Sequence, residues 1–400
     1  MRICSPHCGI SPESGSGGEV YERELLKDLA GLGAECAVLL AAGKPHPERV
    51  PGLVVHPVWP PKGLRWYVTP FVWPRYIKRR WDAEPFDLLR AHSVRFVGPA
   101  ALWARRRYRL PVPVVTHHHH LDPSPLNPVL ERRVLAASDC VVTDSEFARR
   151  QLQAELGLGT DHVRVVYCGV GPEYAPAPRD AALARRWRLD GRRVLLSMGP
   201  LIARKNPLFL VEAFAEIQRA VGGRAVLVWV GSGPLRGAVE ARARALGVAD
   251  DVVLTGYLPE ADKIPMLNLA DVFVFSSLLE GFPLAPQEAM SCGKPVVAFT
   301  VASLPEMVED GGSGFLVARN DRAAFVDRVV RLLGDEPLRA RFGAAAAERV
   351  DRNFRWDDTV RRVHKIYQEA IDDLENGDEG IPFEEFDRDF RARHSLPPKA

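Results

Sequence analysis

Two glutamates lie eight residues apart beside a predicted helix start. Glu280 lies in the loop 280–283, Glu-Gly-Phe-Pro, and Glu288 lies in the short helix predicted after it. Pro286 suits the first turn of that helix and Gly293 suits its C-terminal cap. A helix start offers free N–H groups to an anion, while a carboxylate can accept hydrogen bonds from ribose or sugar hydroxyls. The pattern fits a bound sugar nucleotide, but two solvated glutamates flanking a helix would have the same spacing.

Two cations follow a second predicted strand. The segment 193–199 predicts a buried strand that ends at Gly199, and Arg204 and Lys205 stand just before the next helix. A guanidinium and an ammonium at that place could bind phosphate groups. The Asp-x-Asp at 387–389 lies in a charged stretch and does not predict a metal site. We therefore predict that no metal and no cofactor is needed.

Four consecutive histidines, 117–120, follow the predicted strand 112–116. Neighbouring side chains on a strand point in opposite directions, so four adjacent imidazoles cannot converge on one ion. A metal site would need partners from elsewhere in the chain.

A glycine-rich stretch, SGSGGEVY, precedes the first predicted helix. Gly15, Gly17 and Gly18 would permit a ligand to approach the backbone closely at a helix start. A plain turn explains the same composition.

Short apolar runs alternate with amphipathic segments along most of the chain, which predicts an α/β fold with parallel sheets. The predicted strands of the first half are 2–5, 36–40, 53–57, 112–116 and 139–143; those of the second half are 193–199, 225–231, 252–256, 271–277 and 294–299. The Pro- and Gly-rich segment 169–180 predicts a domain boundary. We predict a domain at 1–178, a second at 179–371 and a charged extension at 372–400, with ligands at the carboxyl ends of the strands.

The composition is that of an ordinary globular protein, with 46% hydrophobic residues and a net charge of +2. This balance argues against a nucleic-acid binder. The six cysteines show no paired metal-finger spacing and favour a reduced, intracellular chain. No leader segment and no apolar run of about 20 residues is visible, so a cytoplasmic protein is expected.

The segment EGFPLAPQEAMSCGKPVVA closely resembles the Glu-x7-Glu block of the retaining family 4 glycosyltransferases, which have two facing Rossmann-like domains, the GT-B architecture. The resemblance extends over about residues 1–371. It implies that Glu280 contacts the transferred sugar and that Glu288 holds the ribose. In the loop that contains Gly281, it implies that the amides of Phe282 and Leu284 bind sugar and phosphate.

The same resemblance assigns further donor contacts. Lys205 matches the family's lysine, but the family's arginine position is Pro200 here. Either Arg204 replaces that arginine or one phosphate contact is missing; Arg204 as a plain surface residue is the alternative.

The family's Thr-x-His spacing selects His118 for a bond to the donor sugar, with His117 and His119 as competitors. Gly17 and Gly18 are implied near the donor phosphates and the acceptor. The last helix, about 356–371, is expected to pack back on the N-terminal domain.

By resemblance, the chain transfers a hexose-type sugar from a UDP- or GDP-linked donor to a glycan, a lipid-linked or a small acceptor, with retention at the anomeric carbon. The implied mechanism is front-face substitution, with His118, Lys205 and Glu280 as the catalytic residues. Charge on the leaving diphosphate must be stabilised, which Lys205 and Arg204 could do. A nucleotide-sugar epimerase on the same fold and a non-catalytic nucleotide-sugar-binding protein are the alternatives.

The segment 58–81 combines four tryptophans with Lys78, Arg79 and Arg80, and three more arginines follow at 105–107. Such a surface suits peripheral contact with anionic lipid at the inner membrane surface. Partly buried aromatic packing is the alternative. The prolines of this segment argue against one continuous amphipathic helix.

Overall fold

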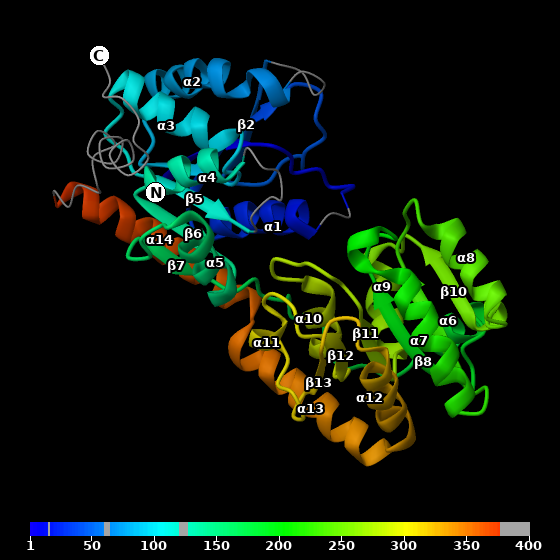
Figure 1. Ribbon diagram of the computed structural model, residues 1–400. Coiled ribbons are helices and arrows are strands. Elements are labelled where there is room, and N and C mark those ends of the chain that lie inside the picture. The colour runs from blue at the N-terminus through cyan, green and yellow to red at the C-terminus, as the bar shows by residue number, and fades with distance from the viewer. Residues whose placement is uncertain (15–16, 60–64, 120–126, 377–400) are drawn as a thin grey trace. The chain divides into compact units, whose positions relative to one another are not determined.

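The computed structural model describes residues 1–14, 17–59, 65–119 and 127–376. Gly15, His120 and the greater part of the predicted extension therefore lie outside the described residues. The chain divides into two compact units (Figure 1). The first comprises Met1–Tyr167 and the C-terminal segment from Thr359, and the second comprises Cys168–Asp358. The segment 169–180, where the sequence predicts a boundary, belongs to the second unit.

The first unit contains one parallel sheet in the order β3-β2-β1-β4-β5-β6-β7. Most of its strands are short apolar runs buried on both faces, as parallel sheets covered by helices require. Two of them, β4 and β7, were not predicted. The strands are β1 (Arg2–His7), β2 (Glu35–Ala41), β3 (Leu53–Val58), β4 (Leu88–Ala91), β5 (Val114–His118), β6 (Cys140–Thr143) and β7 (Val163–Val165).

Helices cover this sheet and bury apolar side chains against it. Trp73 and Ile77 of one helix and the small residues Ala100 and Ala104 of another contribute to the core. The last helix of the chain joins the unit from Thr359 onward. The helices are α1 (Gly17–Gly31), α2 (Arg65–Ala83), α3 (Val97–Tyr108), α4 (Asn127–Ala136), α5 (Glu146–Leu156) and α14 (Trp356–Glu375).

The expectation that prolines would interrupt the segment 58–81 is wrong for its described part. Pro70 and Pro74 both lie inside α2, which is continuous over 19 residues. They are four residues apart, so the two missing N–H groups fall on one side of the helix. Burial of Trp73 and Ile77 in the core offsets that loss.

The second unit contains a six-stranded parallel sheet in the order β10-β9-β8-β11-β12-β13. Five of its strands overlap the predicted segments, and β13 was missed. The strands are β8 (Arg193–Met198), β9 (Ala225–Val230), β10 (Val252–Gly256), β11 (Val272–Phe275), β12 (Val296–Phe299) and β13 (Gly314–Val317). The prediction of two doubly wound parallel sheets is confirmed.

The core of the second unit combines strand residues with side chains from α7, α8, α12 and α13. The helical elements are α6 (Ala181–Arg186), η1 (Ala203–Lys205), α7 (Pro207–Ala220), α8 (Arg236–Ala245), η2 (Ala249–Asp251), α9 (Glu260–Leu269), α10 (Leu284–Ser291), α11 (Leu304–Met307), α12 (Arg322–Gly334) and α13 (Glu336–Asn353). Within the part of the chain that the structure describes, we find no helix long and apolar enough to cross a membrane.

Each sheet reverses its strand order at one place. In the first unit the reversal lies between β1 and β4, and in the second between β8 and β11. At such a switch point the two connections leave in opposite directions, so a crevice opens at the carboxyl ends of the two strands. The residues that follow β1, β4, β8 and β11 are therefore the first candidates for a site.

Candidate functional site

Three charged side chains meet at the switch point of the second unit. Nζ of Lys205 donates to Oε1 of Glu280 at 2.6 Å, and Nη1 of Arg204 donates to Oε2 of the same carboxylate at 2.8 Å. Arg204 and Lys205 come from η1, after β8, whereas Glu280 lies in the loop after β11. We call these three residues the charged triad.

Hydrogen bonds between the two loops fix the triad. The hydroxyl of Ser277 donates to Oε1 of Glu280, and the amide of Leu278 donates to the carbonyl of Arg204 at 2.8 Å. The hydroxyl of Ser276 donates to the carbonyl of Lys205 at 3.0 Å. These serines directly follow β11, so the strand end itself positions the cations of the neighbouring loop.

The side chain of Lys205 passes close to Gly199, just after the end of β8. The glycine has φ +138°, and a Cβ there would lie 3.2 Å from Cε of Lys205. Nζ of Lys205 also lies 4.8 Å from the centroid of the Phe275 ring, at the end of β11. A side chain at position 199 would displace the lysine.

The triad is mostly withdrawn from water but carries a net positive charge. The Glu280 and Lys205 side chains are 7% and 11% exposed, whereas Arg204 is 41% exposed. Burial lowers the pKa of Lys205 from its ordinary value, and the carboxylate of Glu280 opposes that shift. Two cations against one carboxylate favour an incoming anion, which Arg204 can reach from the solvent side.

Helix α10 follows the triad loop and carries Glu288 in its second turn. As predicted, Gly293 lies just past this helix with a positive φ of +71°. Leu284 is its first residue, so the amide of Leu284 has no partner within the helix. The carbonyl of Gly281 accepts a hydrogen bond from Ser303, and the ring of Phe282 packs 5.8 Å from that of Phe354.

Glu288 has a partner that the sequence did not suggest. Nζ of Lys263, in α9, donates to Oε1 of Glu288 at 2.8 Å and to the hydroxyl of Tyr174 at 2.7 Å. Lys263 also lies 5.0 Å from the centroid of the Tyr174 ring. The three residues come from segments that are far apart in the sequence.

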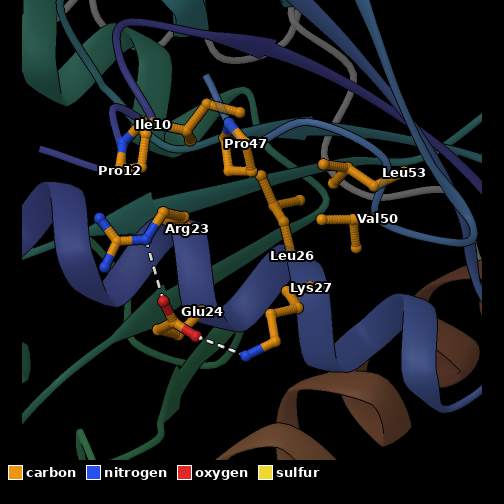
Figure 2. A pocket seen from close by; sticks show the side chains of 9 residues that line it. All are labelled: Ile10, Pro12, Arg23, Glu24, Leu26, Lys27, Pro47, Val50 and Leu53. Atoms are coloured by element: carbon orange, nitrogen blue, oxygen red, sulfur yellow. Dashed lines mark hydrogen bonds and ion pairs between the residues drawn. The ribbon is translucent and has the colours of Figure 1, made fainter. Parts of the chain in front are cut away.

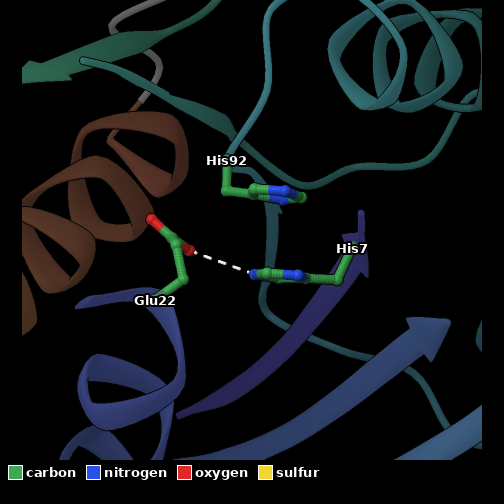
Figure 3. A group of neighbouring side chains, drawn as sticks. All are labelled: His7, Glu22 and His92. Atoms are coloured by element: carbon green, nitrogen blue, oxygen red, sulfur yellow. Dashed lines mark hydrogen bonds and ion pairs between the residues drawn. The ribbon is translucent and has the colours of Figure 1, made fainter. Parts of the chain in front are cut away.

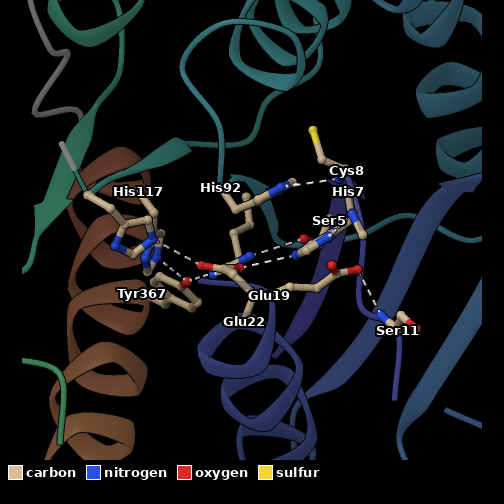
Figure 4. A network of polar contacts seen from close by, with 12 residues as sticks. Ser5, His7, Cys8, Ser11, Glu19, Glu22, His92, His117 and Tyr367 are labelled. Carbon is tan, nitrogen blue, oxygen red and sulfur yellow. Dashed lines mark hydrogen bonds and ion pairs between the residues drawn. The ribbon is translucent and has the colours of Figure 1, made fainter. Parts of the chain in front are cut away.

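A second cluster lies at the switch point of the first unit, and Glu22 of α1 is its centre (Figure 4). Oε2 of Glu22 forms an ion pair with Nη2 of Arg90 at 2.6 Å and accepts a hydrogen bond from Nε2 of His7 at 3.2 Å. Arg90, in β4, also donates to the hydroxyl of Tyr367 in α14 at 2.6 Å. The same hydroxyl also shares a hydrogen bond of 2.6 Å with Nε2 of His117.

The histidine run divides between two sides of β5. His117 and His119 have ring centroids 6.3 Å apart and both belong to the Glu22 cluster. His118 lies between them in the strand, is 2% exposed and by strand alternation faces the other side.

Burial and charge divide the histidines of the cluster into neutral and charged groups. Burial lowers the pKa of His7, His92 and His117, which keeps them neutral. Burial also opposes a charge on His119, but its contacts with Asp144 and Glu22 outweigh that effect and raise its pKa to about 9. Those contacts are 3.5 Å from Nδ1 to Asp144 and 3.3 Å from Nε2 to Glu22.

The ligand-type atoms of His7, Glu22 and His92 lie within 4.8 Å of one another, but their geometry does not suit a metal ion. The rings of His7 and His92 stack in parallel at 3.6 Å, so their in-plane lone pairs cannot converge (Figure 3). Nδ1 of His7 accepts from the amide of Gly9, which places the proton on Nε2, facing Glu22. The second such group, Glu22 with His117 and His119, shares the carboxylate that Arg90 occupies.

A small apolar cavity beside α1 is separate from both clusters (Figure 2). Its charged lining residues satisfy one another, because Glu24 accepts from Arg23 at 2.9 Å and from Lys27 at 3.0 Å. Nothing in this cavity suggests chemistry.

The structure thus brings Arg204, Lys205 and Glu280 together and places Glu288 in the adjoining helix. Gly17 and Gly18 start α1, and a Cβ at Gly18 would meet nothing within 4 Å. The sequence interpretation missed His7, Glu22, Arg90, His92, Asp144, Tyr367, Tyr174, Lys263 and Ser277. His7 and His92 could have been noticed, because His7 ends β1 and His92 directly follows β4 at the carboxyl edge of the sheet.

Comparison with protein families and with known proteins agrees with this arrangement. Residues 181–349 match the family described as glycosyl transferases group 1, and residues 15–174 match glycosyltransferase family 4. The D-inositol 3-phosphate glycosyltransferase 1 of Catenulispora acidiphila is 30% identical, over 90% of this chain and 93% of that protein. The D-inositol 3-phosphate glycosyltransferase of Acidothermus cellulolyticus is 31% identical, over 92% and 87% of the two chains.

Solved structures show the same fold. The sucrose-phosphate synthase of Thermosynechococcus elongatus has a TM-score of 0.77 with 21% identity, covering 92% of this chain and 98% of that one. The Anabaena protein HepE in complex with UDP has a TM-score of 0.78 with 20% identity, covering 92% and 100%.

Proposed function

Because the chain belongs to glycosyltransferase family 4 and is a glycosyltransferase of the GT-B type, we propose that it moves a hexose-type sugar from a UDP- or GDP-linked donor to an acceptor, with retention at the anomeric carbon. HepE, which shares the fold, was solved with UDP and with UDP-glucose. That likeness supports a nucleoside-diphosphate sugar as the donor.

The charged triad is the observation that carries this proposal. Glu280 can accept hydrogen bonds from hydroxyls of the transferred sugar. Lys205 and Arg204, which are bonded to this carboxylate, bind the diphosphate. The bond that breaks joins the sugar to the phosphate, so the triad would lie at the point where charge develops. A fixed ammonium stabilises that charge more in the transition state than in the ground state.

The proposal also assigns the remaining contacts to the donor. Glu288 accepts hydrogen bonds from the ribose hydroxyls, and the amides of Phe282 and Leu284 bind the sugar and the phosphate. His118 hydrogen-bonds to the donor sugar, and the start of α1, at Gly17 and Gly18, lies near the phosphates. These roles rest on the family resemblance together with the position of each residue at a sheet edge or a helix start.

The chemistry we propose is front-face substitution. The acceptor hydroxyl attacks the anomeric carbon while the bond to the phosphate oxygen breaks, and that oxygen takes the acceptor proton. Both oxygens of Glu280 already form ion pairs, so this carboxylate is suited to hold hydroxyls rather than to attack carbon. Neither a metal nor a cofactor enters this scheme.

The names of the relatives suggest the first acceptor to test. Both relatives described above are called D-inositol 3-phosphate glycosyltransferases, so we propose a phosphorylated cyclic polyol as the acceptor class. The experiment incubates the enzyme with UDP- or GDP-hexoses and D-inositol 3-phosphate, and analyses the products by mass spectrometry and NMR. A glycosylated polyol with retained configuration supports the proposal; an inverted configuration contradicts it.

We further propose that the face shared by α2 and α3 makes peripheral contact with anionic membrane. Phe71 and Trp103 are 64% and 43% exposed and contact each other edge to face, with ring centroids 5.7 Å apart. Exposed Arg75 on α2 and Arg106 on α3 flank them. Co-sedimentation with phosphatidylglycerol vesicles, but not with phosphatidylcholine vesicles, is expected and should be lost in Phe71→Ser/Arg75→Glu. Equal behaviour with both vesicle types would refute the contact.

A further inference from the structure

Lys263 lies beside the proposed ribose contact, and neither the triad nor the family pattern explains it. It belongs to α9, which supplies none of the donor contacts named above. Its side chain is 19% exposed, and that of its partner Glu288 is 11% exposed. A buried lysine costs desolvation free energy, so its position beside a ribose-binding carboxylate calls for an explanation.

The position of Lys263 is set by hydrogen bonds that do not involve the side chain of Glu288. Its ammonium bonds to the hydroxyl of Tyr174, and the Tyr174 carbonyl accepts from Ser291, at the end of α10, at 2.6 Å. The next residues are tied to Asn268 of α9: the carbonyl of Ala175 accepts at 3.1 Å and the amide of Ala177 donates at 2.8 Å. The segment that carries Tyr174 is thereby bonded to both helices.

These hydrogen bonds place the lysine where it can fix the orientation of the Glu288 carboxylate. A ribose presents two neighbouring hydroxyls, and a carboxylate accepts both only when its plane is fixed and it is ionised. Lys263 bonds to Oε1 of Glu288 at 2.8 Å, which fixes the rotation of the group and supplies a counter-charge. Without that bond the carboxylate can rotate, and its two oxygens no longer face both hydroxyls at once.

We propose that Lys263 is a positioning residue for the donor nucleotide: together with Tyr174 it holds the carboxylate of Glu288 oriented to accept hydrogen bonds from both ribose hydroxyls. The inference rests on the proposed ribose contact of Glu288 and deepens it. Lys263 acts through Glu288.

The test measures binding of UDP and GDP and of their 2′-deoxy analogues to the full chain by calorimetry. Lys263→Met should weaken binding of the ribonucleotide by about tenfold, the scale of one charged hydrogen bond. It should also lower the preference for ribose over 2′-deoxyribose. Lys263→Arg should restore that preference.

Two variants serve as controls. Lys294→Met removes another lysine that contacts α9. It follows α10 and donates to the carbonyl of Asn268 at 2.9 Å rather than to Glu288, so ribose preference should not change. Tyr174→Phe keeps the ring and removes the hydroxyl, and should cause a smaller change of the same sign as Lys263→Met. It also provides the test should Lys263→Met not fold.

The outcomes distinguish a failure of the positioning role of Lys263 from a failure of the ribose contact of Glu288. If Glu288→Gln leaves the affinity and the ribose preference unchanged, the ribose contact itself is wrong. If Glu288→Gln lowers them while Lys263→Met and Tyr174→Phe do not, the positioning role is wrong and the ribose contact stands. Tighter nucleotide binding by Lys263→Met would also overturn the inference, because the lysine would then compete with ribose.

Discussion

Lys205 and Glu280 are 75 residues apart in the sequence, yet Nζ of the lysine lies 2.6 Å from Oε1 of the glutamate. The contact forms because β8 and β11 are adjacent at the switch point, and each residue lies in the loop that follows one of these strands. One residue is proposed to bind the leaving group and the other the transferred sugar. Under the proposed function, the bond that breaks would lie beside this contact.

Arg204→Ala tests whether this arginine serves in place of the one that the family has at the position of Pro200. Its guanidinium bonds to Glu280 and, at 2.7 Å, to the carbonyl of Leu279. We expect a loss in kcat on the order of 10²-fold, because one electrostatic contact to the leaving diphosphate disappears. Steady-state kinetics with saturating donor measures it. Near-normal kcat would assign Arg204 a surface role.

The pH profile should report the lowered pKa of Lys205. Burial disfavours its charged form, so the free enzyme should lose the ammonium at a pH below the ordinary value for lysine. We expect kcat/KM to fall on the alkaline side, and the corresponding limb of kcat to lie at higher pH, because a bound diphosphate stabilises the ammonium. Lys205→Arg should remove this limb. Identical alkaline limbs in the wild type and in Lys205→Arg would show that another group titrates.

Activity should survive chelation. The triad and the start of α10 supply the positive charge that a divalent ion would otherwise bring. Initial rates with and without EDTA measure this, after the protein has been passed through a chelating resin. Complete loss of activity that Mg²⁺ or Mn²⁺ restores would contradict the proposal.

The stability of the first unit should depend on His119. The folded-state pKa of about 9 exceeds that of an exposed histidine, roughly 6.5, so the protonated side chain stabilises the fold. That contribution is fully present below about pH 6.5 and disappears as the pH rises towards 9. Denaturant unfolding of the wild type and of His119→Gln should therefore give a difference that is largest near pH 6.5 and shrinks towards pH 9. A difference independent of pH would mean that His119 is not charged in the fold.

Much of the fold was predictable because parallel strands are short apolar runs of local sequence. The strand β10 has the predicted bounds, 252–256. The strand β4 was missed because its four residues include Arg90, whose burial depends on Glu22 and Tyr367 from distant helices. Local hydropathy contains no sign of those partners.

The site, like the fold, was predictable only where local sequence contains the signal. Lys205, Glu280 and Glu288 stand in a recognisable block or at a strand end, so their types and spacing could be noted. Their contacts with Ser277 and Lys263 could not, because these depend on strand order and on how the loops pack. The histidine run shows the difference well: alternation along β5 was predictable, whereas the role of Glu22 as the partner of His119 was not.

The central claim is that Lys205 stabilises the leaving diphosphate. Single-turnover transfer by Lys205→Ala, with saturating donor, tests it most directly, and circular dichroism verifies the fold. We predict a fall in the rate of the chemical step on the order of 10²–10³-fold, with a smaller change in donor affinity. A Lys205→Ala enzyme with a near-normal rate would contradict the placement of the diphosphate at the triad.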